Sequence, residues 1–189
     1  MTKIAIVFHS GYGHTKKVAE SVQAGAASTG ASVDLVTIDA EGNIPEAGWE
    51  TLKAADGIIF GSPTYMGMVS WQFKKFADAS SKPWYTMDWK GKVAAGFTNS
   101  ATLNGDKFST LAYLSTLAAQ HKMLWTGTGM HPSNAKAHTR DDLNNLGGYL
   151  GLITASPSDA GVDEMIPGDL KTAQAFGKNV AEVVASVKG

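Results

Sequence analysis

The chain has 189 residues, enough for one domain with a substantial core, and 43% of them are hydrophobic, as in a globular protein. Its 16 lysine and arginine residues nearly balance 17 aspartate and glutamate residues, so charge gives no argument for binding nucleic acid or an anionic membrane. The absence of cysteine excludes disulfides, thiolate metal sites and thiol redox chemistry.

Strand-like and helix-like segments alternate along the chain. The apolar run at residues 4–8 is typical of a strand covered on both faces, and the next segment carries Val18, Val22 and Ala26 at helical spacing. Further strands are predicted at residues 32–38, 57–60, 93–98 and 123–126. Further helices are predicted at residues 46–55, around 71–77, at 108–120 and at about 168–187. Residues 127–148 are long for a structureless loop, which favours a functional or interfacial role, and a strand is expected to resume within residues 149–154.

This alternation predicts an α/β three-layer sandwich that forms a single domain over residues 1–189. Strands that alternate with helices pack as a parallel sheet with helices on both faces. Five strands suit the order 2-1-3-4-5 of the flavodoxin-like fold, in which ligands bind at the carboxyl ends of the strands. The loops after the first, third and fourth strands should therefore meet at one ligand.

The loop after the first strand is suited to hold a phosphate. Gly11 and Gly13 allow a tight turn that presents backbone N–H groups, and Ser10 and Thr15 add hydroxyls. The helix that follows contributes the partial positive charge of its N-terminus. The sequence has neither the Gly-Lys-Ser/Thr of a P-loop nor the third glycine of the dinucleotide motif. Taken alone, the loop could equally be an ordinary turn with a hydroxyl cap.

The loops after the third and fourth strands complete the expected site. In residues 61–68, Pro63 stiffens the chain and Gly67 permits a turn, so this loop could border a flat ring. Residues 98–105 are rich in hydroxyls and amides that could bond the polar edge and ribityl chain of a flavin. Each loop alone could be a simple turn or a helix cap. Three such loops at one end of a sheet favour bound flavin mononucleotide (FMN).

Several short motifs occur in a specific order and spacing. They are Ser10-Gly11-Tyr12-Gly13-His14, Ile59-Phe60-Gly61-Ser62-Pro63-Thr64, Phe76-Ala77-Asp78 followed by Trp84, the loop from Thr98, and residues 175–181. Over nearly the whole chain, this order resembles the flavodoxin-like NAD(P)H:quinone oxidoreductases of the WrbA type. One departure is Tyr65-Met66, where that family usually carries Arg-Phe, so a cationic contact to cofactor or nicotinamide is lost.

The resemblance implies a set of site residues. It implies that the FMN phosphate is held by Ser10, Gly11, Tyr12, Gly13, His14 and Thr15. It implies that the isoalloxazine is bordered by Pro63, Thr64, Tyr65, Met66 and Gly67. Its polar edge and the ribityl chain would meet Asn99, Ser100, Ala101, Thr102, Leu103 and Asn104. Tyr12 would lie near the nicotinamide, and Trp84 would form part of the aromatic wall on which nicotinamide or quinone stacks.

The leading hypothesis for function is an FMN-dependent oxidoreductase that transfers two electrons from NAD(P)H to a quinone-type acceptor. The flavin carries the difficult chemistry, so no side chain is needed as a catalytic nucleophile. A flavodoxin-type electron carrier is the alternative, although the net charge of −1 gives no strongly acidic docking face. A flavin-free binding module on the same scaffold is a third hypothesis.

Other expectations concern metals, location and assembly. The spacing of His121, His131 and His138 matches no metal-ligand pattern, so no metal is expected. The apolar run at residues 4–8 is too short for a signal peptide, and no later run is long enough to span a bilayer, so a cytoplasmic protein is expected. A homodimer or homotetramer is expected, with neither nucleic acid nor membrane as a partner.

Overall fold

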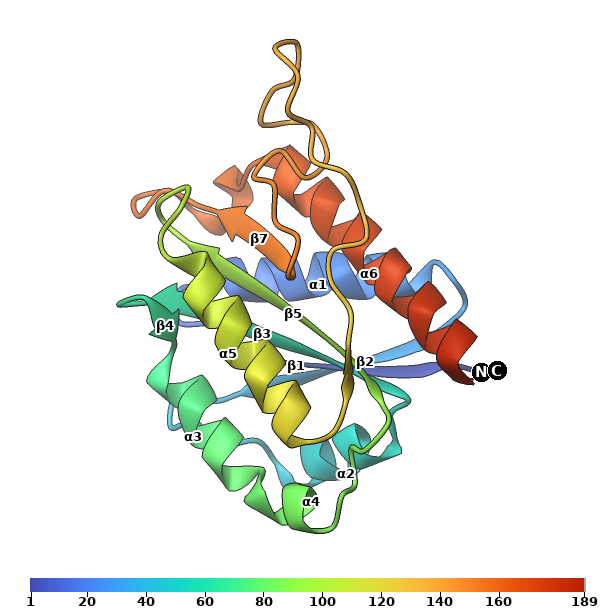
Figure 1. The fold of residues 1–189 in the computed structure, drawn as a ribbon. Coiled ribbons are helices and arrows are strands. Elements are labelled where there is room, and N and C mark those ends of the chain that lie inside the picture. The colour runs from blue at the N-terminus through green and yellow to red at the C-terminus, as the bar shows by residue number, and fades with distance from the viewer. Residues whose placement is uncertain (189) are drawn as a thin grey trace.

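The predicted strands form one sheet in a computed structural model that describes residues 1–188 (Figure 1). Its parallel strands are β1 (Lys3–His9), β2 (Ser32–Ile38), β3 (Gly57–Tyr65), β5 (Val93–Ser100), β6 (Leu124–Trp125) and β7 (Leu152–Ala155). They lie in the order β2-β1-β3-β5-β6, with β7 also beside β5. The predicted flavodoxin-like order is therefore confirmed. The short β4 (Met68–Val69) adds an antiparallel hairpin to β3.

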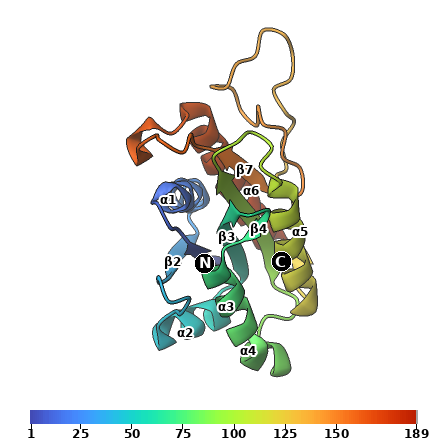
Figure 2. The same ribbon diagram turned by 90° about the vertical axis from the view of Figure 1, so that its left-hand side faces the viewer.

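Helices cover both faces of this sheet (Figures 1 and 2). One face carries α1 (His14–Ala27) and α6 (Pro167–Lys188). The other carries α2 (Glu46–Ala54), α3 (Trp71–Ala79) and α5 (Lys107–Gln120), and the short α4 (Ser81–Tyr85) follows α3. Along β1, Ile4 and Ile6 pack toward α1 and α6, whereas Ala5 and Val7 pack toward the other layer. Because both faces are buried, the strand is apolar from Ile4 to Phe8.

Two glycines let α1 and α6 approach closely. A side chain at Gly25 would collide with the backbone of Gln174, and one at Gly177 would collide with the backbone of Val22. The pair therefore packs backbone to backbone, and α6 buries Phe176 between α1 and the sheet. Within residues 1–188, no helix combines the length and the apolar character needed to cross a membrane.

The fifth strand of the sheet is interrupted by an insertion. β6 pairs with β5 at Val93 and Ala94, and β7 pairs with the other end of β5, from Phe97 to Ser100. Residues 126–151, which we call the inserted segment, leave the sheet between these two pieces and project beyond it (Figures 1 and 2). The Trp125 indole donates to the Leu150 carbonyl at 2.9 Å, so the chain leaves and returns at neighbouring points.

Two strands run further than the sequence predicted. β3 was expected to end at residue 60 and β5 at residue 98, but they continue to Tyr65 and Ser100. Pairing between β3 and β5 extends both strands, since Ser62 lies opposite Thr98 and Pro63 lies opposite Asn99. Much of the expected second loop is therefore strand, which fixes its side chains on a rigid element.

Candidate functional site

A cavity of about 590 Å³ opens at the carboxyl ends of the parallel strands, and we call it the first cavity. The three predicted loops meet in it, together with a fourth. Its lining comprises Tyr12, His14, Thr15, Pro63, Thr64, Tyr65, Asn99, Ser100, Ala101, Ser156, Pro157, Ser158, Ala160, Gly161 and Val162. This volume lies within the range of small-molecule sites, about 300–1,000 Å³.

The first loop presents the N-terminus of α1 to the cavity. Gly13 has a φ of +92°, a conformation that favours glycine, and it brings the chain directly into the helix. The Ser10 hydroxyl accepts the N–H groups of Gly13 and Lys16, each at 3.1 Å, so it shapes the turn. Among residues 1–188, the hydrogen bonds of this turn leave the N–H groups of His14 and Thr15 free. Free N–H groups at a helix N-terminus form an anion site.

Two tyrosines from different loops meet at the cavity. The ring centroids of Tyr12 and Tyr65 are 6.2 Å apart with an interplanar angle of 74°, an edge-to-face contact. Tyr12 is 79% exposed, whereas Tyr65 lies over Gly11, where a Cβ atom would come within 2.5 Å of its hydroxyl. Burial raises the pKa of Tyr65, and neighbouring Tyr12 adds to the shift. The tyrosines offer apolar ring surface beside the anion site.

A buried threonine cluster holds the second loop to the third. The Thr64 hydroxyl lies 2.8 Å from the hydroxyls of both Thr98 and Thr110. These contacts join β3 to β5 and to α5. The Thr64 hydroxyl is consequently engaged within the protein, and Thr64 contributes to the cavity mainly as a fixed wall.

The amide of Asn99 is held in one orientation. Its Oδ1 accepts from the Thr154 hydroxyl at 2.8 Å and from the Ser156 hydroxyl at 3.1 Å. Asn99 is 6% exposed and lines the first cavity. Because its oxygen is engaged, Asn99 has its NH2 group to offer to a ligand acceptor.

The fourth loop, residues 156–162, is the part of the site that sequence reasoning missed. It follows β7, and it is tied to the first loop because His14 Nε2 donates to the Ala160 carbonyl at 3.0 Å. Val162, in a short 3-10 turn (Val162–Glu164), packs against Gly13. The sequence carries a signal for this loop, because Ser156-Pro157 follows the strand-like residues 149–154 much as Ser62-Pro63 follows the strand predicted at residues 57–60. The rule that parallel strands end together applies to both.

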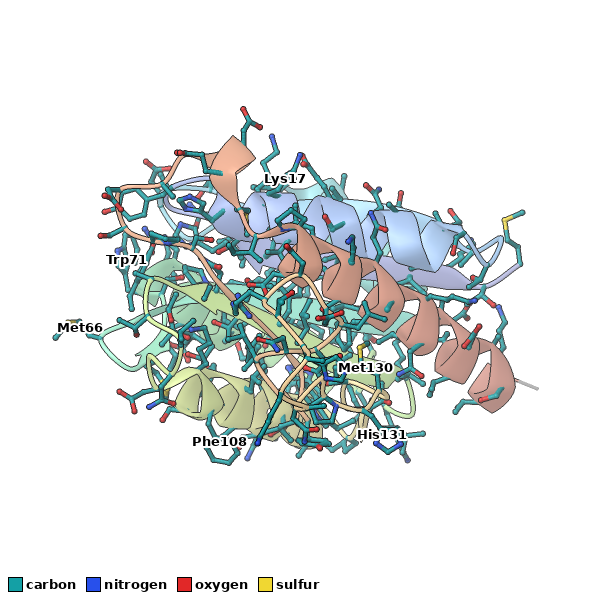
Figure 3. The ribbon with its side chains drawn as sticks, turned by 90° about the horizontal axis from the view of Figure 1, so that it is seen from above. Lys17, Met66, Trp71, Phe108, Met130 and His131 are labelled. Atoms are coloured by element: carbon teal, nitrogen blue, oxygen red, sulfur yellow. The ribbon has the colours of Figure 1, made fainter. Side chains whose placement is uncertain are left out.

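Two residues of the predicted second loop do not reach the first cavity. Met66 and Gly67 form the tip of the β3–β4 hairpin, with φ values of +49° and +80°. Two positive φ angles in succession are typical of a tight hairpin turn. Met66 is fully exposed and points away from the molecule (Figure 3). The extension of β3 to Tyr65 causes this, because it moves the turn beyond the cavity.

The predicted third loop is divided between two places. Asn99, Ser100 and Ala101 line the first cavity. Leu103 and Asn104 line a different cavity, beside α5. Thr102 is exposed and lines neither of them.

Within one chain, Trp84 lies away from the first cavity. It sits in α4, because α3 leads the chain away from the carboxyl ends of the strands (Figure 1). Lys122 Nζ lies 4.7 Å from the centroid of a Trp84 ring, and Trp84 borders a separate groove of about 330 Å³ with Tyr113 and His121. The structure therefore does not bring the expected stacking residue to the expected site.

His121 has a structural environment. Its ring lies 4.1 Å from the Trp89 ring, centroid to centroid, and its Nε2 lies 2.9 Å from the Ser80 hydroxyl. That hydroxyl donates to the Ala77 carbonyl, so His121 Nε2 carries the proton. Burial lowers the pKa of His121 to about 4, which keeps the ring neutral near pH 7. Among the residues that the structure describes, no group of three His, Cys, Asp or Glu side chains could hold a metal ion.

Comparisons with known proteins agree with this arrangement. Residues 2–150 match the family model described as NADPH-dependent FMN reductase. A protein named flavodoxin FldP, from Pseudomonas aeruginosa, is 51% identical over 97% of each chain. A protein named NAD(P)H dehydrogenase (quinone), from Archaeoglobus fulgidus, is 33% identical, again over 97% of each chain.

A solved structure gives the same picture. A flavodoxin, WrbA-like protein from Agrobacterium tumefaciens matches with a TM-score of 0.81 and 48% identity, covering 98% of this chain and 99% of the other. The resemblance predicted from the short motifs is thereby confirmed.

Proposed function

The chain belongs to the NADPH-dependent FMN reductase family, and from that premise we propose that it is an oxidoreductase that carries two electrons from NAD(P)H to a quinone-type acceptor with FMN as cofactor. The observation that carries this proposal is the first cavity, where an anion site and aromatic surface lie together. Relatives named NAD(P)H dehydrogenase (quinone), at 33% and 31% identity, support the choice of donor and acceptor.

The residues of the first cavity fit FMN. The free N–H groups of His14 and Thr15 would bind the phosphate at the N-terminus of α1. The NH2 group of Asn99 would donate to an acceptor on the polar edge of the ring. Tyr12 and Tyr65 would lie beside the flat ring system. Bound FMN would supply the hydride chemistry, which amino-acid side chains lack.

The role of the protein in this reaction is to bind and orient. Among the described residues that line the first cavity there is no lysine, arginine, aspartate or glutamate. The phosphate would thus be held by backbone dipoles, and no carboxylate would oppose negative charge gained by the ring on reduction. Exposed Tyr12 leaves one side of the site accessible, where donor and acceptor could be bound in turn.

An absorbance experiment tests the proposal in two steps. Purified protein incubated with FMN and then desalted should keep the flavin bands, NADH or NADPH should bleach them, and benzoquinone should restore them. A protein that stays colourless would contradict the cofactor. A yellow protein that oxidises NAD(P)H only at the background rate would contradict the enzyme and support the electron carrier, which the 51% identity to a protein named flavodoxin favours.

A matched pair of variants locates the cofactor. Gly13 and Gly30 have φ values of +92° and +85°, so alanine strains the backbone at either position. Only Gly13 lies in the first loop, while Gly30 has no atom within 4 Å of an added Cβ. Gly13→Ala should weaken FMN binding about tenfold or more, and Gly30→Ala should leave it unchanged. Equal FMN affinity in the two variants would place the cofactor elsewhere.

A further inference from the structure

A second cavity, of about 920 Å³, lies between α5 and the inserted segment. It is the place where Leu103 and Asn104 are found. Its walls are mainly apolar and include Phe108, Leu111, Leu146, Leu150 and Ile153. Phe108 stands on the side of α5 that faces away from the sheet (Figure 3). The second cavity shares no lining residue with the first, so the two are separate, and it is large enough for a small molecule.

One buried cation and one partly buried cation border these apolar walls. Lys107 is 2% exposed, and its Nζ donates to the carbonyl oxygens of Thr102 and Leu103, the latter at 3.1 Å. Arg140 Nη2 donates to Asp169 Oδ2 at 2.8 Å. Both cations line the second cavity, and Asp169 is the carboxylate that faces them. Two cations therefore share one buried anion, which leaves an excess of one positive charge.

The guanidinium of Arg140 has an unused donor at this point. Its Nη1 is buried and has no hydrogen-bond partner among residues 1–188. Asp169 Oδ2 also accepts the Ala155 N–H at 2.8 Å, so this carboxylate oxygen already serves two donors. A buried donor without an acceptor is unfavourable. The cavity thus combines a guanidinium that still has an unpaired donor, on a side chain that is 28% exposed, with a large apolar surface.

We propose that the second cavity is a binding site for a small amphipathic carboxylate. The carboxylate of such a ligand would meet Arg140 and Lys107, and its apolar body would lie against Phe108, Leu111 and Ile153. Charge complementarity selects an anion, and the apolar walls exclude a small hydrophilic one. This site is additional to the proposed FMN site and does not depend on the proposed function.

The probe is 2-naphthoate, with 2-naphthamide as a control of the same shape and no charge. Calorimetric titration of the full chain, with and without FMN, should give a Kd for naphthoate below about 1 mM. The amide should bind about tenfold more weakly or worse, because it lacks the charge that Arg140 and Lys107 recognise. Equal affinity for acid and amide, or no binding of the acid, would overturn the proposal.

A cavity-filling pair of variants locates the probe without removing any charge. Leu146→Trp places a larger side chain in the second cavity and should abolish naphthoate binding. Leu124→Trp, at a 52% exposed position of β6 outside both cavities, should leave it unchanged. Naphthoate binding that survives Leu146→Trp, or naphthoate that displaces FMN, would place the probe elsewhere and overturn the proposal.

A charge-conserving variant tests the role of the guanidinium. Arg140→Lys keeps a cation beside Asp169 but removes the unused Nη1 donor, and it should weaken naphthoate binding about tenfold. Unchanged affinity would overturn the assignment.

Sedimentation velocity over a range of protein concentrations tests whether a second copy of the chain occupies the second cavity. If the chain self-associates, and if Leu146→Trp abolishes this self-association while naphthoate leaves it unchanged, the second cavity is an interface with another copy of the chain and the proposal is overturned.

Discussion

The first cavity presents backbone N–H groups and no charged side chain in its described lining, whereas the second cavity holds the buried Lys107 and the partly buried Arg140 beside apolar walls. The same stretch of chain separates them, since Asn99 faces the first and Leu103 faces the second. Each could hold an anion, but by different means. Backbone dipoles do not titrate, while buried charges do and require a counter-charge.

This difference indicates where the protein is sensitive to substitution. The second cavity depends on a balance of charges that a single side chain can upset. The first depends on backbone geometry and on shared hydrogen bonds, so changes there should act more locally. Four substitutions or conditions test this contrast.

Asp169→Ala should have the largest effect. Asp169 is 4% exposed and is the carboxylate that faces both Arg140 and Lys107. Its loss would leave buried positive charge unbalanced and should lower the free energy of unfolding by about 3–5 kcal/mol. Asp78→Ala, which removes an exposed ion pair with Lys74, should cost about 1 kcal/mol or less. Urea unfolding measures both, and similar values would refute the need for a counter-charge.

Alkaline pH should stabilise the protein through Lys107. Burial lowers the pKa of Lys107 to about 8, against about 10.4 in an unfolded chain. The unfolded state therefore binds more protons between these values, and the free energy of unfolding should rise with pH from about 8 to 10.4. The gain attributable to Lys107 is at most about 3 kcal/mol. The free energy of unfolding is measured against pH for the unmodified chain and for Lys107→Met, and the difference between the two profiles isolates the gain from Lys107. Parallel profiles would contradict this gain.

Asn99→Ala tests the hydrogen bonds of the first cavity. It removes the acceptor shared by Thr154 and Ser156 and should lower the free energy of unfolding by about 1–3 kcal/mol. FMN affinity should fall as well, because the NH2 group is lost. The control is Asn145→Ala, whose amide donates to the Ser133 carbonyl within the inserted segment. An equal loss of FMN affinity in both variants would mean that Asn99 has no direct role.

Met66→Gly should have the smallest effect, and a stabilising one. Met66 has a φ of +49° at the hairpin tip, where glycine is less strained. The greater freedom of glycine in the unfolded chain opposes this gain, so the net increase should be at most about 1 kcal/mol. FMN affinity should not change, since Met66 lies outside the first cavity. A weaker cofactor affinity would show that the hairpin tip reaches the ligand.

The order of strands and the meeting of the three loops could be predicted from sequence. The apolar run at residues 4–8 marks a strand buried on both faces, and parallel strands must end at a common edge. Tyr12, Thr64 and Asn99 therefore had to come together, and they do. The ends of the strands could not be predicted. Pro63 and Gly67 are typical of loops, but pairing with β5 keeps residues 61–63 extended, and pairing with β4 extends the strand to Tyr65.

The fourth loop and the position of Trp84 show two further limits. Ser156 is separated in sequence from the first piece of its strand by the inserted segment, so its relation to the other loops was hidden. The predicted position of Trp84 rested on the motif Phe76-Ala77-Asp78 that precedes it in the sequence. A motif gives order along the chain, but the length and direction of α3 decide where Trp84 lies.

The interrupted fifth strand also bears on how the protein avoids aggregation. A strand at the border of a sheet exposes N–H and C=O groups with which a foreign strand can pair. Here that border consists of β6, with two residues, and β7, with four. The chain turns outward between them, so an incoming strand finds no long continuous ladder to extend. At this border of the sheet, the inserted segment thus opposes pairing with a strand of another molecule.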